Sequence, residues 1–70
     1  MAVQKHLIIT GTSNISWKDA TLNAIKNVAK TIDYISNIKI LEQRANITNN
    51  KISEYFVDID LTFTVDTERE

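Results

Sequence analysis

The sequence predicts a small α+β protein in which three strands and one helix follow the order strand, helix, strand, strand. Residues 55–65 alternate between apolar and polar side chains almost without exception, which is typical of a strand with one buried face. Residues 17–32 instead repeat apolar side chains every three or four positions, which predicts an amphipathic helix. The pair Asn49-Asn50 separates two strand-like segments and predicts a hairpin turn. We therefore expect one domain over residues 1–70.

The first strand is predicted at Val3–Thr10, a segment rich in aliphatic and β-branched residues. Gly11, the only glycine of the chain, and the polar residues 12–14 follow it. Glycine and small polar residues favour turns, so we expect the strand to end before Gly11.

The helix is predicted to begin after Ser16, whose hydroxyl can accept a hydrogen bond from a free amide of the first turn. Its apolar stripe consists of Trp17, Ala20, Ala24, Ile25, Val28, Ala29 and Ile32. We expect the helix to end between Thr31 and Tyr34, which gives it about 17 residues and a length of about 25 Å. Trp17, at the start of the helix, is expected to anchor it in the core or in an interface.

The second and third strands are predicted at Ile38–Ile47 and Ile52–Val65. Asparagine tolerates positive φ, so Asn49-Asn50 can form the two-residue turn between them. This turn sets the pairing of the two strands and places apolar residues opposite one another on the helix side. The expected pairs are Ile47 with Ile52, Ile40 with Ile59, Ile38 with Leu61, Asn37 with Thr62 and Gln43 with Phe56.

One helix can cover only one face of such a sheet, so the other face must meet water or another subunit. Alternation places Ile8, Leu41 and Phe56 on that face, together with Asn37, Lys39 and Gln43. Apolar residues gathered there predict a contact surface, with a subunit contact favoured over a pocket for a flat ligand. A 70-residue chain without cysteine has no disulfide to stabilise it, and oligomerisation is the remaining compensation.

Composition and single residues indicate which classes of function to expect. The formal charge of −1 leaves no basic surface for nucleic acid or an anionic membrane. The apolar run near the N-terminus is too short for a signal peptide or a membrane span, so we expect a soluble cytoplasmic protein. His6 has no nucleophile in a recognisable motif, and we expect no enzyme. Asp58 and Asp60 point the same way from one strand and are candidate ligands for a hard cation such as Ca²⁺.

Four segments of the sequence resemble the dodecin family. They are GTS at 11–13, SW-x-DA at 16–20, AKT at 29–31 and EYFVDIDLTFTV at 54–65. The resemblance implies a homododecameric hollow shell, in which each subunit wraps a three-stranded antiparallel sheet around one helix. It also implies a storage or protective role, with flavins such as FMN or riboflavin as ligands and coenzyme A in some members.

Two residues at the family's ligand positions depart from its pattern. Asn37 stands where the flavin-stacking tryptophan is expected, and Phe56 stands where a flavin-binding glutamine is expected. Lys5 and Arg44 match basic positions near the phosphate-bearing side of the flavin, and Ser36 precedes the replaced tryptophan. The resemblance therefore predicts a dodecin-like shell with weak or absent flavin binding. The alternatives are a shell that binds Ca²⁺ or a nucleotide cofactor such as coenzyme A, and a purely structural oligomer.

Overall fold

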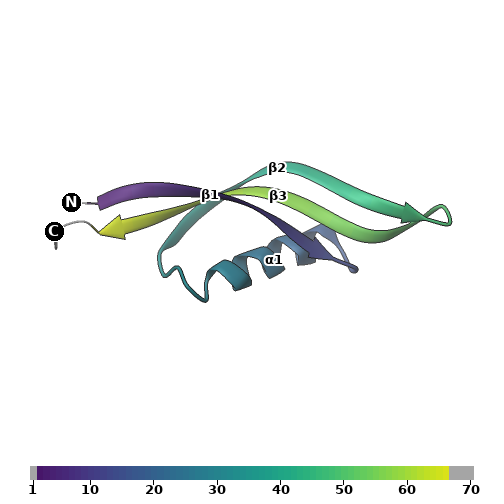
Figure 1. The fold of residues 1–70 in the computed structure, drawn as a ribbon, viewed down its shortest axis with the longest axis horizontal. Helices are drawn as coiled ribbons and strands as arrows, with labels where there is room; N and C mark the ends of the chain where they lie inside the picture. The colour runs from purple at the N-terminus through teal and green to yellow at the C-terminus, as the bar shows by residue number, and fades with distance from the viewer. Residues whose placement is uncertain (1, 67–70) are drawn as a thin grey trace.

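The computed structural model describes residues 2–66, which form three strands and one helix (Figure 1). The elements are β1 (Ala2–Ser13), α1 (Trp17–Val28), β2 (Ile35–Thr48) and β3 (Lys51–Asp66). The strands form one sheet in the order β1-β3-β2, and β3 pairs antiparallel with both neighbours. This confirms the predicted fold class, a three-stranded antiparallel sheet with one helix. Among these residues, no helix has the length and apolar character that a membrane span requires.

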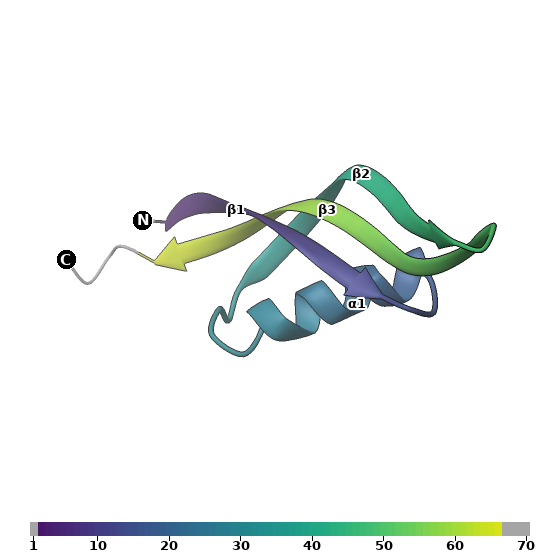
Figure 2. The same ribbon diagram turned by 45° about the vertical axis from the view of Figure 1, so that its right-hand side comes forward.

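The sheet curves over α1, which packs against β1 and β3 (Figure 2). We call the sheet face that meets α1 the helix face and the opposite one the open face. The core consists of small helix residues against aliphatic residues of β3: Ala20, Ala24, Val28, Val57, Ile59 and Leu61. A core of this size gives a 70-residue chain little stability on its own. The radius of gyration, 14.7 Å, also exceeds the roughly 11 Å of a compact domain of this length.

The prediction that the first strand ends before Gly11 is wrong, since β1 continues to Ser13. Gly11 pairs with Val57 inside the sheet and lies directly beneath α1. A Cβ atom at this position would come within 2.2 Å of the Ala20 carbonyl oxygen. The glycine therefore serves the close approach of helix and strand instead of a turn.

The helix begins as predicted, because the Ser16 hydroxyl accepts a hydrogen bond from the Asp19 amide at 3.0 Å. Trp17 anchors the first turn in an edge-to-face contact with Tyr55, with ring centroids 4.9 Å apart. The predicted helix end, between Thr31 and Tyr34, is wrong: α1 ends at Val28. After it, the amides of Lys30 and Thr31 bond to carbonyls three residues back, the tighter pattern that often ends a helix.

The turn between β2 and β3 is confirmed, with positive φ at Asn49 (53°) and Asn50 (63°). The structure also confirms four of the five predicted pairs: Ile47 with Ile52, Ile40 with Ile59, Ile38 with Leu61 and Asn37 with Thr62. The fifth is wrong, because Phe56 pairs with Arg44 and Gln43 pairs with Val57.

Single extra residues explain the wrong pair. Ser53 on β3 and Leu41 on β2 each lack a partner, so the pairing between them is shifted by one position. A one-residue shift exchanges the faces of a strand. The shift therefore carries Gln43 to the helix face and Arg44 to the open face.

Candidate functional site

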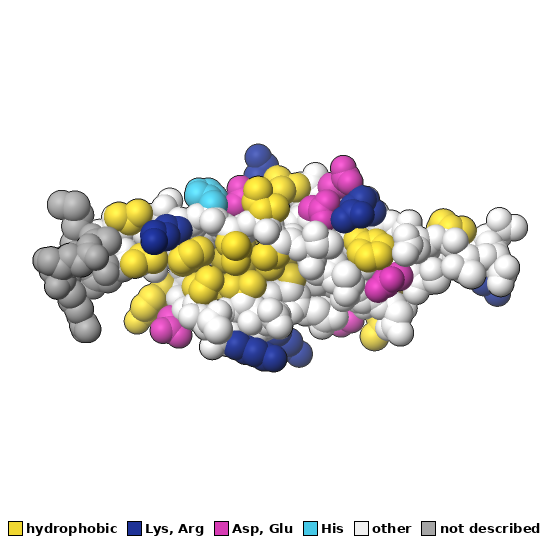
Figure 3. Space-filling model, in the orientation of Figure 1, with side chains coloured by type: hydrophobic (Ala, Val, Ile, Leu, Met, Phe, Trp, Pro, Cys, Tyr) yellow, Lys and Arg dark blue, Asp and Glu magenta, His cyan; other side chains and the backbone are white. Residues whose placement is uncertain are grey.

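The open face presents a row of polar side chains around one aromatic ring. Along β3 these are Phe56, Asp58, Asp60 and Thr62, and their partners on β1 are Thr12, Thr10, Ile8 and His6. The matching residues of β2 are Arg44, Glu42, Lys39 and Asn37. Acidic and basic side chains also gather along the upper margin of the molecule in Figure 3, beside its single histidine. The open face is therefore mostly polar, and α1 does not cover it.

Arg44 is the centre of the best-connected group on this face. Its Nη2 donates to Asp58 Oδ1 at 2.9 Å, and its Nε lies 3.3 Å from Glu42 Oε2. Thr10 donates its hydroxyl to the same Asp58 oxygen at 2.8 Å. The Arg44 guanidinium carbon also lies 5.3 Å from the centroid of the Phe56 ring, which is cation–π range. Ion pairing and stacking thus hold one guanidinium in place across two strands.

These contacts shift the pKa values of both partners. The hydrogen bond from Arg44, followed by that from Thr10, lowers the pKa of Asp58 below its usual value. The hydrogen bond to Asp58 raises the pKa of Arg44 above its usual value. The charged forms of both groups therefore favour each other on the open face.

A second group connects His6 with Asp60 and Thr62. The His6 Nδ1 lies 3.0 Å from Asp60 Oδ1 and 3.3 Å from Thr62 Oγ1. The imidazole is well exposed, whereas the Asp60 carboxylate is about three-quarters shielded. The group joins the edge strand β1 to the central strand β3.

The structure brings Arg44 and Phe56 together but places Asn37 elsewhere. Asn37 pairs with Thr62, six residues from Phe56 along β3, a separation of roughly 20 Å. Ser36 is a further unpaired residue of β2, and its hydroxyl donates to the Thr62 carbonyl at 3.2 Å. One subunit therefore cannot close Asn37 and Phe56 around the same small ring system.

Lys5 lies apart from the other predicted ligand residues. It pairs with Phe63, whose side chain packs against the core on the helix face. Lys5 and Arg44 therefore belong to opposite faces of the sheet, although both are exposed. A ligand on the open face of one subunit would meet Arg44 but not Lys5 of that subunit.

The predicted apolar patch is not continuous. Ile8 and Leu41 are both exposed, but they lie on the two outer strands with β3 between them. Between them β3 presents Asp58 and Asp60, which carry the hydrogen-bonded groups described above. The open face therefore offers isolated apolar side chains in a charged surround.

Asp58 and Asp60 share the open face, as alternation predicted, but each already has protein partners. Asp58 binds Arg44 and Thr10, and Asp60 binds His6. Among the described residues, no group of three or more His, Cys, Asp or Glu side chains is arranged to hold a metal ion. Because Ca²⁺ takes six to eight oxygen ligands, an ion here would need further donors.

Sequence reasoning did not find the Arg44–Phe56 contact or the Arg44–Asp58–Thr10 group. Both depend on the register shift between Leu41 and Ser53, and no local sequence signal marks those two positions. The Thr10–Asp58 contact could more easily have been inferred from the sequence, because polar side chains on the same face of neighbouring strands often pair across a sheet.

Comparison with known proteins gives the same fold. Dodecin from Streptomyces davaonensis matches with a TM-score of 0.87 and 22% identity, over 93% of this chain and 96% of that one. A point mutant of the Thermus thermophilus dodecin matches with a TM-score of 0.89 and 24% identity, over 94% and 98%. Calcium dodecin from Mycobacterium tuberculosis, described as calcium-chelating, matches with a TM-score of 0.80 and 26% identity, over 97% of both chains. A search of curated proteins gave no match.

Fold and surface together define a class: small α+β proteins of β-α-β-β order whose single sheet curves around one helix and leaves its other face open. The model of the Dodecin family matches residues 3–66, nearly the whole chain. The chain belongs to the dodecin family.

Proposed function

We propose that this protein is a subunit of a dodecin-type homododecamer that binds and stores a ligand, and that its affinity for flavins is weak or absent. It has no proposed catalytic role. The observation that carries the flavin part of the proposal is the stacking of Arg44 on Phe56, 5.3 Å from guanidinium carbon to ring centroid. Phe56 stands at the position of the flavin-binding glutamine of the family, and the Arg44 guanidinium already lies over its ring.

The chemistry of the replaced positions supports weak flavin binding. A tryptophan at position 37 would add about 0.5–1.5 kcal/mol of aromatic stacking beyond the buried area, and Asn37 has no ring to supply it. A glutamine at position 56 could donate to and accept from the polar edge of the flavin ring, and Phe56 can do neither. Each polar group of the ring left unpaired in a buried pocket would cost about 1–3 kcal/mol.

The positions of the basic residues also favour a shared site over one within a subunit. Arg44 is the only predicted phosphate-side residue on the open face, and its guanidinium is bound to Asp58. Lys5 lies on the helix face. A ligand that used Lys5, Ser36, Asn37, Arg44 and Phe56 together would have to lie between subunits.

The second candidate function is cation storage, favoured by the similarity to a calcium dodecin at 26% identity. In this proposal Asp58 and Asp60 supply two carboxylates, and Ca²⁺ displaces Arg44 from Asp58. Further oxygen donors would come from neighbouring subunits. Coenzyme A binding and a purely structural shell complete the alternatives.

Native mass spectrometry and ligand titration test the proposal. We expect a mass twelve times that of the 8.0 kDa chain, and FMN and riboflavin fluorescence that stays constant under saturating protein. A monomer mass would contradict the assembly, and strong quenching would contradict the loss of flavin binding. A melting temperature that rises with Ca²⁺ but not with Mg²⁺ or FMN would establish the second candidate instead.

A further inference from the structure

The middle of the ladder between β2 and β3 has two possible registers. A ladder that ran unbroken from the turn would place Gln43 opposite Phe56. The structure instead leaves Leu41 and Ser53 unpaired and places Arg44 opposite Phe56. At the two ends of this segment both registers contain the same pairs, which are Ile47 with Ile52 and Ile40 with Ile59. The two registers therefore differ only in which side chains of the middle segment reach each face.

The register decides which side chain of β2 meets Phe56 on the open face. In the observed register it is Arg44, whose guanidinium carbon lies 5.3 Å from the ring centroid and whose Nη2 donates to Asp58 at 2.9 Å. In the unbroken register Arg44 would move to the helix face, opposite Tyr55, and the Gln43 amide would take its place. An amide can both donate and accept, whereas a guanidinium only donates and carries a charge. One sequence thus encodes two kinds of wall for a ligand.

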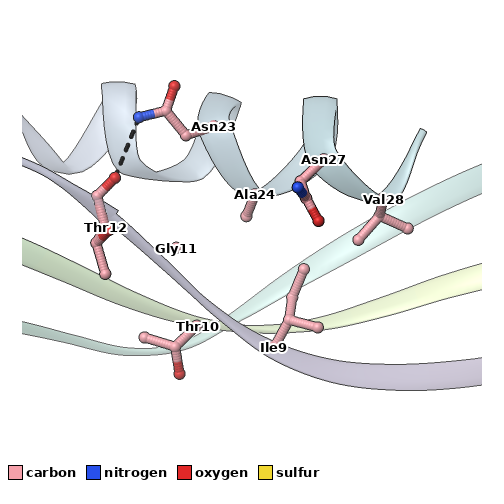
Figure 4. Close-up of a pocket in the computed structure, with 8 residues that line it drawn as sticks. All are labelled: Ile9, Thr10, Gly11, Thr12, Asn23, Ala24, Asn27 and Val28. Atoms are coloured by element: carbon pink, nitrogen blue, oxygen red, sulfur yellow. Dashed lines mark hydrogen bonds between the residues drawn. The ribbon is translucent and has the colours of Figure 1, made fainter. Parts of the chain in front are cut away.

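The faces of β3 are fixed from the other side of the sheet. β1 pairs with β3 without interruption along its whole length. Thr12 of β1 pairs with Phe56, and the Asn23 side chain of α1 donates to the Thr12 carbonyl at 3.1 Å (Figure 4). Val57, the next residue of β3, is fully buried. β2 is therefore the strand whose side chains would exchange faces.

The observed register leaves two residues out of the ladder, and other contacts must offset this loss. At one end, the Ser53 hydroxyl donates to the Asn46 carbonyl at 3.3 Å and accepts from the Thr48 hydroxyl at 3.2 Å. These bonds accommodate the extra residue beside the turn. They lie outside the centre of the segment, so they do not explain why Arg44 instead of Gln43 lies on the open face.

Trp17 of α1 makes the contacts that distinguish the two registers. Its indole lies edge-to-face against Tyr55, and its Nε1 donates to the Arg44 carbonyl at 2.9 Å. The β2 partner of Tyr55 is Ala45, whose single methyl group leaves space for the indole. In the unbroken register Arg44 would stand opposite Tyr55, and its long side chain would compete with the indole for that space. The indole therefore favours the register with Ala45 on the helix face.

We propose that Trp17 is a positioning residue for the open face. It selects the register that places Arg44 beside Phe56 and keeps Gln43 on the helix face. It does so by filling the space beside Tyr55 and by holding the backbone of β2. This inference rests on the proposed function, because the wall that Trp17 positions is the one that replaces the flavin-binding wall. One helix residue thus specifies the chemistry on the opposite side of the sheet.

A double-mutant cycle measured in several backgrounds tests this role. Arg44→Met and Phe56→Leu, alone and together, are denatured in urea, and the departure from additivity gives their coupling. We expect coupling in wild type and in Trp17→Phe, which keeps a ring against Tyr55, and its loss in Trp17→Ala. The matched control is Val28→Ala, which removes core packing at the other end of α1 and should keep the coupling.

A deletion variant separates an effect on register from a general loss of stability. Removing both Leu41 and Ser53 makes the unbroken ladder itself place Arg44 opposite Phe56. In this shortened chain Trp17→Ala should keep the coupling. If Trp17→Ala folds only together with the deletion, Trp17→Leu supplies the comparison in the full chain and should reduce the coupling.

Coupling that persists in the full chain without Trp17 would overturn the inference. Its absence from wild type, or its loss in the shortened chain with Trp17→Ala, would overturn it as well. These outcomes leave the flavin titration untouched. Strong FMN quenching by wild type would instead contradict the proposed function and would leave the measured effect of Trp17 on the register in place.

Discussion

The two faces of the sheet hold the subunit together in different ways. On the helix face, Val57, Ile59 and Leu61 are fully buried against small residues of α1. On the open face, the neighbouring residues Asp58 and Asp60 are held by Arg44, Thr10 and His6 through hydrogen bonds and charge. The first face supplies the hydrophobic free energy of folding, and the second keeps a polar surface ordered and accessible. Alternation along a single strand, β3, produces both.

The comparison shows how ligand chemistry can change within a family while the fold is kept. Substitutions at Asn37 and Phe56 lie outside the buried core, so they leave the packing of β3 on α1 unchanged. The fold can therefore persist while the open face acquires different chemistry.

The largest effect is expected on the helix face. Ile59→Ala removes a fully buried side chain at the centre of the core and should lower the free energy of unfolding by about 2–5 kcal/mol. Ile8→Ala on the open face removes a side chain that is 67% exposed and should change it by less than about 0.5 kcal/mol. Urea denaturation of both variants measures the difference. A comparable loss from Ile8→Ala would show that another subunit buries the open face there.

A smaller effect is expected for the Arg44–Phe56 contact. A double-mutant cycle with Arg44→Met and Phe56→Leu should give a coupling energy of about 0.5–1 kcal/mol, the range of an exposed cation–π pair. Urea denaturation of the two single variants and the double variant supplies the cycle. Strict additivity of the two substitutions would mean that the ring of Phe56 is free to receive a ligand.

The smallest effect concerns acid stability. The folded-state pKa of Asp58 is lowered by Arg44 and Thr10, so its contribution to stability is present above the unfolded pKa of about 3.9 and is lost as the pH falls through the folded value. We expect the gap in urea midpoint between wild type and Asp58→Asn to narrow from pH 6 to pH 3. In an Arg44→Met background the gap should be smaller at every pH. A gap that is constant with pH would contradict the ion pair.

Sequence alone predicted the elements, their order, the Asn49-Asn50 turn and most of the strand pairing, because these follow from local periodicity and turn chemistry. It missed the end of α1 at Val28 and the role of Gly11, since both depend on how closely the helix packs against the sheet. It also misplaced Gln43 and Arg44, because the unpaired residues Leu41 and Ser53 shift the pairing between them by one position.

The candidate site was predicted less completely than the fold. The positions of Asn37 and Phe56 came from the family pattern, and their separation of roughly 20 Å followed from strand geometry. The side-chain partners of Arg44 required the three-dimensional pairing.

Flavin titration of two matched proteins tests the central claim, that the dodecin fold is kept while the flavin-binding wall is replaced. Wild type and the double variant Asn37→Trp with Phe56→Gln are each added to FMN, and its fluorescence is recorded until it no longer changes. The account predicts unchanged fluorescence with wild type and strong quenching with the double variant, at equal native mass. Equal quenching by both proteins would contradict it.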